Sequence, residues 1–227
     1  MTKSPESQLP EVASQRVEYH NDGLLESDLA DTPAEQFVRW FHQAESELRE
    51  PNAVALVTAD DSGPTARTVL LKGFDDAGFT IFTNYASLKS AQIDADPRVA
   101  LLFPWHELER QVRVRGVARK VDEAASDAYF ASRERGSQLG AWASRQSSPV
   151  SSRAEMESRL LEFERRFAGQ VVPRPPHWGG FRIEPTEIEF WAGRQGRFHD
   201  RLVYASVTRQ PANLSDSAAW RVERRYP

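Results

Sequence analysis

The chain has 227 residues, of which 40% are hydrophobic and 27% are charged, values that are usual for a globular protein with an ordinary core. Its net charge of −4 argues against general binding to nucleic acid, which needs a basic surface, and its lack of cysteine excludes disulfides and thiolate metal sites. The start of the chain shows no signal-peptide pattern, and no apolar run reaches about 18 residues, so we expect a cytoplasmic protein without a membrane span.

Residues 1–31 are polar and lack a regular hydrophobic pattern, so we expect a mobile N-terminal arm. Arg16 and Tyr19 are its most distinctive side chains, and the arm could serve as a lid or simply be disordered. The next segment, Thr32-Pro33-Ala34-Glu35, predicts a helix start, because it offers a Thr cap, a Pro in the first turn and a Glu for a capping box. A single domain is therefore expected over residues 32–227.

Three short strands are expected after this helix, over residues 53–58, 67–74 and 79–84. Turn sequences rich in Asp and Gly separate them at residues 60–64 and 75–78. Strands this close together, joined by tight turns, indicate an antiparallel meander rather than a parallel unit with crossover helices. The sequence therefore favours a mainly β fold.

The middle strand contains Arg67-Thr68-Val69-Leu70-Leu71-Lys72, with a cation at each end. Because successive side chains of a strand point to opposite faces, Arg67 and Lys72 should leave it on opposite sides, about 17 Å apart at about 3.4 Å per residue. Two anionic groups, or one long ligand, could contact both cations. The alternative is a half-buried strand whose cationic ends are solvated.

A short helix is expected over residues 87–94, and Lys89 lies in its first turn. The free N–H groups and the dipole at a helix N-terminus favour an anion there, whereas the alternative is an ordinary surface lysine. Two further strands are expected over residues 99–105 and 111–121. Gln111 lies on the polar face of the second one, which by default contacts solvent.

Asp122 predicts the cap of a helix that runs to about Arg133. Tyr129 and Arg133 are four residues apart and so share one face of it, and Ser137 follows shortly afterwards. These three side chains could form a cup for a phosphate group, because a guanidinium binds phosphate through two parallel hydrogen bonds. The alternative for Tyr129 is a half-buried aromatic residue.

The last third of the chain should contain one helix, which opens with a second capping box at Ser152, and several strands. We expect the strands over residues 181–191, 198–204 and 220–224. Residues 140–148 should form a loop or a short helix, and residues 206–217 a polar loop that is variable or mobile.

Arg197 and His199 are two positions apart on one expected strand, so they should share a face. A guanidinium beside an imidazole can bind an anion and transfer a proton, whereas the alternative is simple surface placement. The sequence has no glycine-rich dinucleotide or ATP motif and no HExxH, and its five histidines are scattered without metal-ligand spacing. We therefore expect no metal site.

Several motifs occur here in the same order as in the pyridoxamine 5′-phosphate oxidases, and the chain resembles that family over about residues 16–227. The motifs are Arg67-Thr-Val-Leu-Leu-Lys72, Leu101-Leu-Phe-Pro-Trp105, Glu109-Arg-Gln111, Gln138-Leu-Gly-Ala-Trp142, Ser144-Arg-Gln-Ser147, Trp178-Gly-Gly-Phe181, Glu189-Phe-Trp191 and Arg197-x-His199-Asp200-Arg201. Because so many separate motifs keep their order, chance is a poor explanation.

The resemblance implies an antiparallel split β-barrel with flanking helices, which binds FMN and forms a homodimer with the flavin at the subunit interface. Arg67 would bind the FMN phosphate, and the other flavin contacts would be Thr68, Val69, Leu70, Leu71, Lys72, Phe82, Thr83, Lys89, Gln111, Gln146, Ser147, Trp191 and Arg201. The substrate phosphate would contact Lys72, Tyr129, Arg133 and Ser137. Arg197 and His199 would face the pyridine ring as catalytic residues, and Arg16 and Tyr19 would form the lid.

The activity that the resemblance implies is oxidation of pyridoxamine or pyridoxine 5′-phosphate to pyridoxal 5′-phosphate, with O₂ as electron acceptor and H₂O₂ as product. The alternatives are another flavin oxidase or reductase of the same fold, and a protein that binds FMN or pyridoxal phosphate without catalysis. Three features depart from the family. Leu88 stands where an Arg is usual, the chain ends in Arg224-Arg225-Tyr226-Pro227 instead of Arg-Leu-x-Pro, and the loop over residues 206–217 is longer.

Overall fold

The computed structural model describes residue 15 and residues 17–227, so Arg16 of the expected lid lies outside the described residues. The strands are β1 Ala53–Asp60, β2 Gly63–Asp75, β3 Gly78–Asn84, β4 Arg98–Trp105, β5 Arg110–Lys120, β6 Trp178–Ala192, β7 Asp200–Ser206 and β8 Trp220–Arg224. The helices are α1 Pro33–Glu47, α2 Leu88–Ala95, α3 Glu123–Ser132, α4 Arg135–Ala143 and α5 Arg153–Arg166. No helix of this described part is long and apolar enough to cross a membrane.

Six antiparallel strands close into a barrel. They follow the order β3-β2-β1-β4-β5-β6, and β3 also pairs with β6, so the sheet returns to its first strand. Closure pairs β3 on its second side as well, so the barrel itself does not end at β3. The mainly β class and the antiparallel barrel with flanking helices are confirmed.

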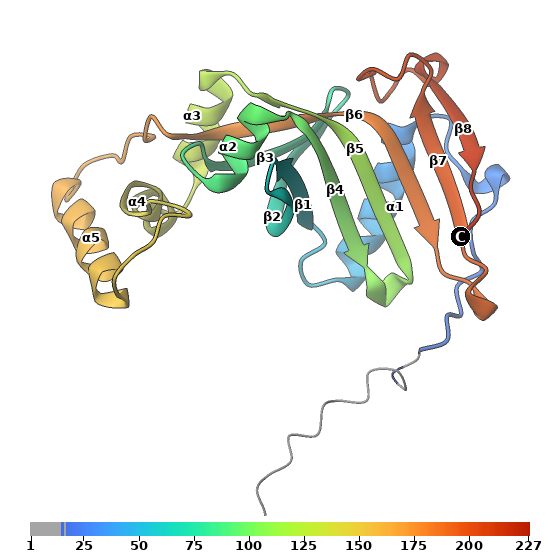
Figure 1. Ribbon diagram of the computed structural model, residues 1–227, viewed down its shortest axis with the longest axis horizontal. Helices are drawn as coiled ribbons and strands as arrows, with labels where there is room; N and C mark the ends of the chain where they lie inside the picture. The colour runs from blue at the N-terminus through green and yellow to red at the C-terminus, as the bar shows by residue number, and fades with distance from the viewer. Residues whose placement is uncertain (1–14, 16) are drawn as a thin grey trace, which may run out of the picture.

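The barrel splits at β6, the longest strand, which crosses the centre of Figure 1. Residues 178–183 of β6 pair with β3, whereas residues 187–192 pair with β7. Between these halves the register with β5 shifts at Gly116, opposite Pro185, where a side chain on residue 116 would collide with the carbonyl oxygen of Glu184. The bulge bends β6 away from the barrel, so β7 and β8 extend the sheet to one side.

The main core fills the barrel and continues under α1. The strands alternate between buried and exposed positions, as in β1, because one face of each strand points inward. Helix α1 starts as expected, with the Thr32 side chain accepting a hydrogen bond from the Glu35 N–H. Its residue Phe37 lies 4.9 Å from the Phe79 ring and 5.3 Å from the Phe103 ring, which joins the helix to the barrel.

A smaller core lies at the other end of the molecule, where α3, α4 and α5 gather beside the first half of β6 (Figure 1). Its buried members include Phe130 of α3, Leu139 of α4 and Phe163 of α5, and they pack against Trp178. A loop or short helix was expected over residues 140–148. Helix α4 starts earlier, at Arg135, and ends at Ala143, so only the part of that segment from Ser144 onward is loop. The small core therefore fixes α4 beside the barrel wall.

Two segments are more closely attached to the barrel than their polar sequences suggested. In the loop over residues 206–217, Leu214 is fully buried, and its N–H donates to the carbonyl of Asp76 at 2.8 Å. The sequence also suggested that the domain starts at residue 32, but Leu24 belongs to the main core. Both attachments use a single apolar side chain, which a composition-based prediction does not detect.

Candidate active site

A cavity of about 670 Å³ opens between β2, β3 and the helices α2, α3 and α4. This volume lies within the range of about 300–1,000 Å³ that is common for ligand sites. Of the residues predicted from the resemblance, thirteen line it: Arg67, Thr68, Val69, Leu70, Lys72, Phe82, Thr83, Lys89, Tyr129, Arg133, Ser137, Gln146 and Ser147. The structure therefore brings together a set of side chains that is scattered over 81 residues of sequence, from 67 to 147.

Arg67 and Lys72 line the same cavity, although strand alternation predicted opposite sides. Over residues 63–70, β2 pairs with β1 alone, and its pairing with β3 begins only at Leu71. Leu71 itself turns into the barrel core, and its side chain does not line the cavity. The edge of β2 that β3 leaves unpaired thus forms one wall of the cavity, along which two cations lie with Thr68, Val69 and Leu70 between them.

Lys89 is not an ordinary surface lysine, because its side chain is only 8% exposed. Its Nζ donates to the Gln146 side-chain oxygen at 2.7 Å and to the hydroxyls of Thr83 and Ser87 at 3.0 Å each. Burial, and then the charge of Arg67, lower the pKa of Lys89 to about 8. Two cations that repel one another on one wall favour an anion between them.

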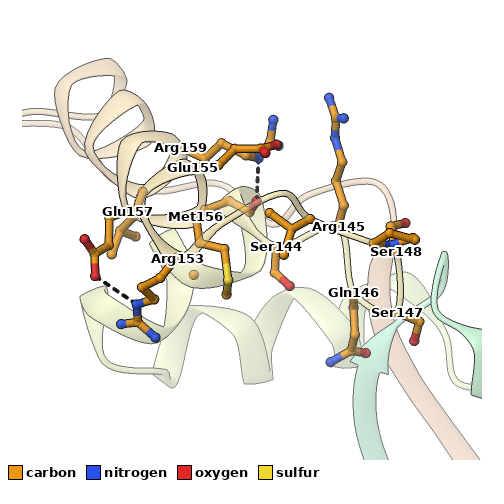
Figure 2. A pocket seen from close by; sticks show the side chains of 15 residues that line it. Ser144, Arg145, Gln146, Ser147, Ser148, Arg153, Glu155, Met156, Glu157 and Arg159 are labelled. Carbon is orange, nitrogen blue, oxygen red and sulfur yellow. Dashed lines mark hydrogen bonds and ion pairs between the residues drawn. The ribbon is translucent and has the colours of Figure 1, made fainter.

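The loop after α4 forms the opposite wall, and Figure 2 shows its side chains. Gln146 and Ser147 point to the other side of this loop from Arg145. The Ser147 hydroxyl accepts the N–H of Leu88 at 3.2 Å, and Ser147 has a φ of 74°, a conformation that is rare for residues other than glycine. A second cavity, of about 410 Å³, lies between this loop and α5.

Lys72, Tyr129, Arg133 and Ser137 lie together in the large cavity, as the predicted phosphate cup requires. The Arg133 guanidinium lies 4.7 Å from the centre of the Trp178 ring. Its Nη1 atom is buried and has no hydrogen-bond partner among the described residues. A buried guanidinium nitrogen without an acceptor fits a bound phosphate oxygen, because such an atom is costly to leave unpaired.

Three aromatic rings are stacked at this cup, and one of them, Tyr129, belongs to it. Phe82 lies 4.1 Å from Tyr129 with an angle of 23° between the rings, and 5.5 Å from Trp178 with an angle of 11°. A side chain at Gly180 would approach Phe82 to 2.8 Å, so the glycine is needed for this close contact. Trp178 was not among the predicted site residues, and its signal in the sequence is its place in the motif Trp178-Gly-Gly-Phe181.

The other predicted residues form a second cluster, at the far end of the sheet. Gln111, Trp191 and Arg201 are direct neighbours across β5, β6 and β7. Tyr19 and His199 pack on Trp191, with ring centres 5.8 Å and 4.7 Å away. None of these five residues lines the large cavity, and Figure 1 shows the end of β6 and the start of β7 well apart from α3 and α4.

Arg197 and His199 are not on a strand, which corrects the sequence prediction. Arg197 ends a 3₁₀ turn, Gln195–Arg197, with a φ of 61°, and β7 begins only at Asp200. They lie instead in the connection between β6 and β7, where no rule of alternating faces applies. The Nδ1 atom of His199 accepts the backbone N–H of Arg194 at 3.1 Å.

The hydrogen bond from Arg194 decides which ring nitrogen of neutral His199 carries the hydrogen. Because Nδ1 accepts, a neutral imidazole has its hydrogen on Nε2 and can donate from that atom. Burial, and then the charge of Arg197, lower the pKa of His199, although Asp200 opposes this shift. His199 is therefore suited to donate a hydrogen bond rather than to accept a proton.

Comparison with known proteins decides between the possible families. Residues 41–167 match the model of the family described as pyridoxamine 5′-phosphate oxidase. Residues 178–227 match the pyridoxine 5′-phosphate oxidase C-terminal dimerisation region. The chain belongs to the pyridoxamine 5′-phosphate oxidase family. It is an oxidoreductase, and the second cluster lies in a region that this family uses for dimerisation, except for Tyr19 and Gln111.

Individual relatives cover nearly the whole chain. The pyridoxine/pyridoxamine 5′-phosphate oxidase of Rubrobacter xylanophilus is 59% identical over 88% of this chain and 94% of its own length. The enzyme of the same name from Bordetella pertussis is 50% identical over 95% of this chain and 99% of its own.

Solved structures show the same fold. PhzG from Burkholderia lata 383, in complex with tetrahydrophenazine-1-carboxylic acid, has a TM-score of 0.79 at 28% identity and covers 91% of this chain and 98% of its own. A pyridoxamine 5′-phosphate oxidase-related, FMN-binding protein from Nostoc punctiforme has a TM-score of 0.66 at 16% identity, over 88% of this chain and 100% of its own. The expectation that FMN is the cofactor agrees with the family.

Proposed function

We propose that this oxidase converts pyridoxamine or pyridoxine 5′-phosphate to pyridoxal 5′-phosphate, with O₂ as the electron acceptor and H₂O₂ as the product. The observation that supports this most strongly is the cup of Lys72, Tyr129, Arg133 and Ser137, which lies in one cavity with an unpaired guanidinium nitrogen. A substrate without a phosphate would leave the Nη1 atom of Arg133 buried and without an acceptor.

The proposal assigns the two ends of the cavity to two phosphates. Lys89, which donates to Thr83 and Gln146, and Arg67, which lines the same cavity, would hold the phosphate of FMN. Arg133 stacks on Trp178 at the other end and would hold the phosphate of the substrate. Lys72 lies on the wall between them, where its charge can favour either anion.

We infer that the complete site is formed by two protomers. The cavity of one protomer lacks the cluster of Trp191, Arg197, His199 and Arg201, which lies in the matched dimerisation region. In a homodimer with the flavin at the interface, the cluster of one protomer would face the cavity of the other. This arrangement accounts for why the predicted contacts form two separate groups in a single chain.

The chain's own groups would bind and orient the substrate. Bound FMN would supply the hydride acceptor for the C4′ carbon. The phosphate cup fixes one end of the substrate, and such positioning can contribute a large part of the rate enhancement. Arg197 would hold the pyridine ring through its permanent charge, and His199 would donate a hydrogen bond from Nε2 to a substituent of that ring.

Anaerobic mixing with pyridoxamine 5′-phosphate tests the proposal. We expect the absorbance of oxidised flavin to bleach, and to return with release of H₂O₂ when air is admitted. Pyridoxamine without its phosphate serves as the matched control and should react much more slowly at the same concentration. Binding of the phosphorylated compound without bleaching would indicate a non-enzymatic binding protein, and bleaching only with an unphosphorylated substrate would indicate another flavin oxidase of this fold.

A further inference from the structure

Gln92 lies on α2, three residues after Lys89, but it does not line the cavity and is only 1% exposed. A fully buried amide next to a cation of a binding site needs an explanation, because its desolvation must be offset by hydrogen bonds. We propose that Gln92 is a positioning residue, which holds the guanidinium of Arg67 toward the FMN phosphate. This inference depends on the proposed role of Arg67.

The side-chain oxygen of Gln92 accepts three hydrogen bonds at once. The donors are the Thr58 hydroxyl at 2.6 Å, the Thr65 hydroxyl at 2.8 Å and the Nη2 of Arg67 at 3.2 Å. Arg67 also donates from Nη1 to the Thr58 hydroxyl at 2.6 Å and to the Leu56 carbonyl at 3.2 Å, and from Nη2 to the Thr65 hydroxyl. These bonds use the four hydrogens of the two terminal nitrogens, so the Nε hydrogen and the charge of Arg67 remain for a ligand. Gln92 thus contacts Arg67 both directly and through two threonines.

Asp60 decides the orientation of the Gln92 amide. The Nε2 of Gln92 donates to the Asp60 carboxylate at 3.0 Å. Hydrogen bonds from Ser62 and then from Gln92 lower the pKa of Asp60, so this group stays ionised and can only accept. The amide nitrogen must therefore face Asp60, which leaves the amide oxygen facing Arg67.

The threonine hydroxyls depend on this oxygen. Each hydroxyl has one hydrogen, and both donate it to Gln92, so their lone pairs are free to accept from Arg67. Without an acceptor at position 92 the two hydroxyls would rotate, and Arg67 would lose its fixed side-chain partners on both nitrogens, which leaves only the Leu56 carbonyl on Nη1. Gln92 therefore orders the side-chain contacts behind the guanidinium.

A neutral acceptor suits this position better than a carboxylate. Arg67 keeps its full charge for a ligand, whereas a carboxylate at this distance would neutralise it. Lys89 and Arg67 are both cations that line this cavity, so they repel one another and an unrestrained guanidinium would move away from Lys89. The contacts with Gln92 and the threonines oppose that movement and keep both cations beside one phosphate.

Replacement of Gln92 by methionine tests the inference, because methionine has a similar length and no oxygen. The protein freed of flavin is titrated with FMN and, separately, with riboflavin, which lacks the phosphate, and quenching of flavin fluorescence gives both dissociation constants. We expect the FMN dissociation constant of Gln92→Met to rise about tenfold, the loss of roughly one charge-assisted hydrogen bond, while that of riboflavin stays unchanged. A purely structural role would weaken both flavins equally.

Two further variants keep the test decisive. Thr65→Val removes the hydroxyl that lies on the partly exposed side. We expect a smaller rise in the dissociation constant, again for FMN and not for riboflavin. This variant also serves as the test if Gln92→Met fails to fold. Arg67→Met should abolish most of the preference for FMN over riboflavin. If Arg67→Met has this effect while Gln92→Met and Thr65→Val bind FMN normally, the inference about Gln92 is overturned and the role of Arg67 stands. If Arg67→Met leaves the preference unchanged, the proposed role of Arg67 fails first.

Discussion

The carboxylate of Asp200 accepts the backbone N–H of Leu24 at 2.9 Å, although 176 residues separate the two in sequence. Asp200 also pairs with Arg194 and Arg224 and is itself buried. Five residues before Leu24, Tyr19 lies on Trp191 and His199. The segment before α1 is thus tied to the second cluster, around Trp191 and His199, by a carboxylate that directly follows His199.

Replacing Asp200 by alanine should destabilise the protein by about 1–3 kcal/mol, because the buried Leu24 N–H loses its acceptor and two arginines lose a partner. Urea unfolding measures this change, and limited proteolysis should show faster cleavage between residues 17 and 31. The control is Glu26→Gln, which removes the charge from the more exposed pair with Arg224 and should cost much less stability. Equal stability losses in the two variants would contradict the central role of Asp200.

The affinity for FMN should fall as the pH rises through about 8. Lys89 has a pKa of about 8 in the protein without ligand, so it is charged below this pH and neutral above it. The phosphate of FMN is a dianion throughout this range, since its second pKa is about 6, and it binds the charged lysine better. Titration with FMN from pH 6.5 to 9.5 measures the effect. Riboflavin binding should not show it, and neither should FMN binding to Lys89→Met.

The acid side of the pH profile of kcat/KM should lie below pH 6.5, the ordinary pKa of histidine, because His199 works as a neutral donor and its pKa is lowered. Replacement of Arg197 by leucine removes one cause of that shift. We therefore expect Arg197→Leu to move the acid limb to higher pH, in addition to lowering kcat/KM by more than about tenfold. Steady-state assays from pH 5 to 8 measure both effects. Loss of activity in Arg197→Leu without movement of the acid limb would show that the charge of Arg197 does not set the pKa that this limb reports.

Leu88→Arg should tighten FMN binding. Leu88 lines the cavity next to Lys89 and is half exposed, so an arginine there can reach the same anion without burying its whole side chain. Because water reaches part of the site, we expect the dissociation constant to fall about threefold to tenfold. This is a smaller effect than a fully buried charged hydrogen bond would give. Leu88→Gln is the neutral control. An unchanged dissociation constant in Leu88→Arg would show that Arg67 and Lys89 already satisfy the phosphate.

Local patterns of the sequence were enough for the elements that depend on neighbours in the chain. The N-cap side chains of Thr32, Asp122 and Ser152 each accept the expected backbone N–H, whereas the Glu155 side chain accepts from Ser151 rather than from the Ser152 N–H that a capping box requires. The alternation of apolar residues placed most strands, and helical spacing brought Tyr129 and Arg133 together. These features follow from backbone geometry within a few residues, so the sequence determines them directly. The ordered motifs likewise sufficed for the family.

Other features were decided only by contacts between distant segments. The shared cavity of Arg67 and Lys72 depends on the pairing of β2, which joins β3 only from Leu71 onward and so leaves one edge of residues 67–70 beside the cavity. The backbone of Arg197 and the proton of His199 depend on the connection between β6 and β7 and on the amide of Arg194. Gln92 has no distinctive sequence signal, because its partners lie on β1 and β2, at least 25 residues earlier in the chain. Such positions are set by packing and by the satisfaction of buried hydrogen bonds, and these become defined only when the barrel closes.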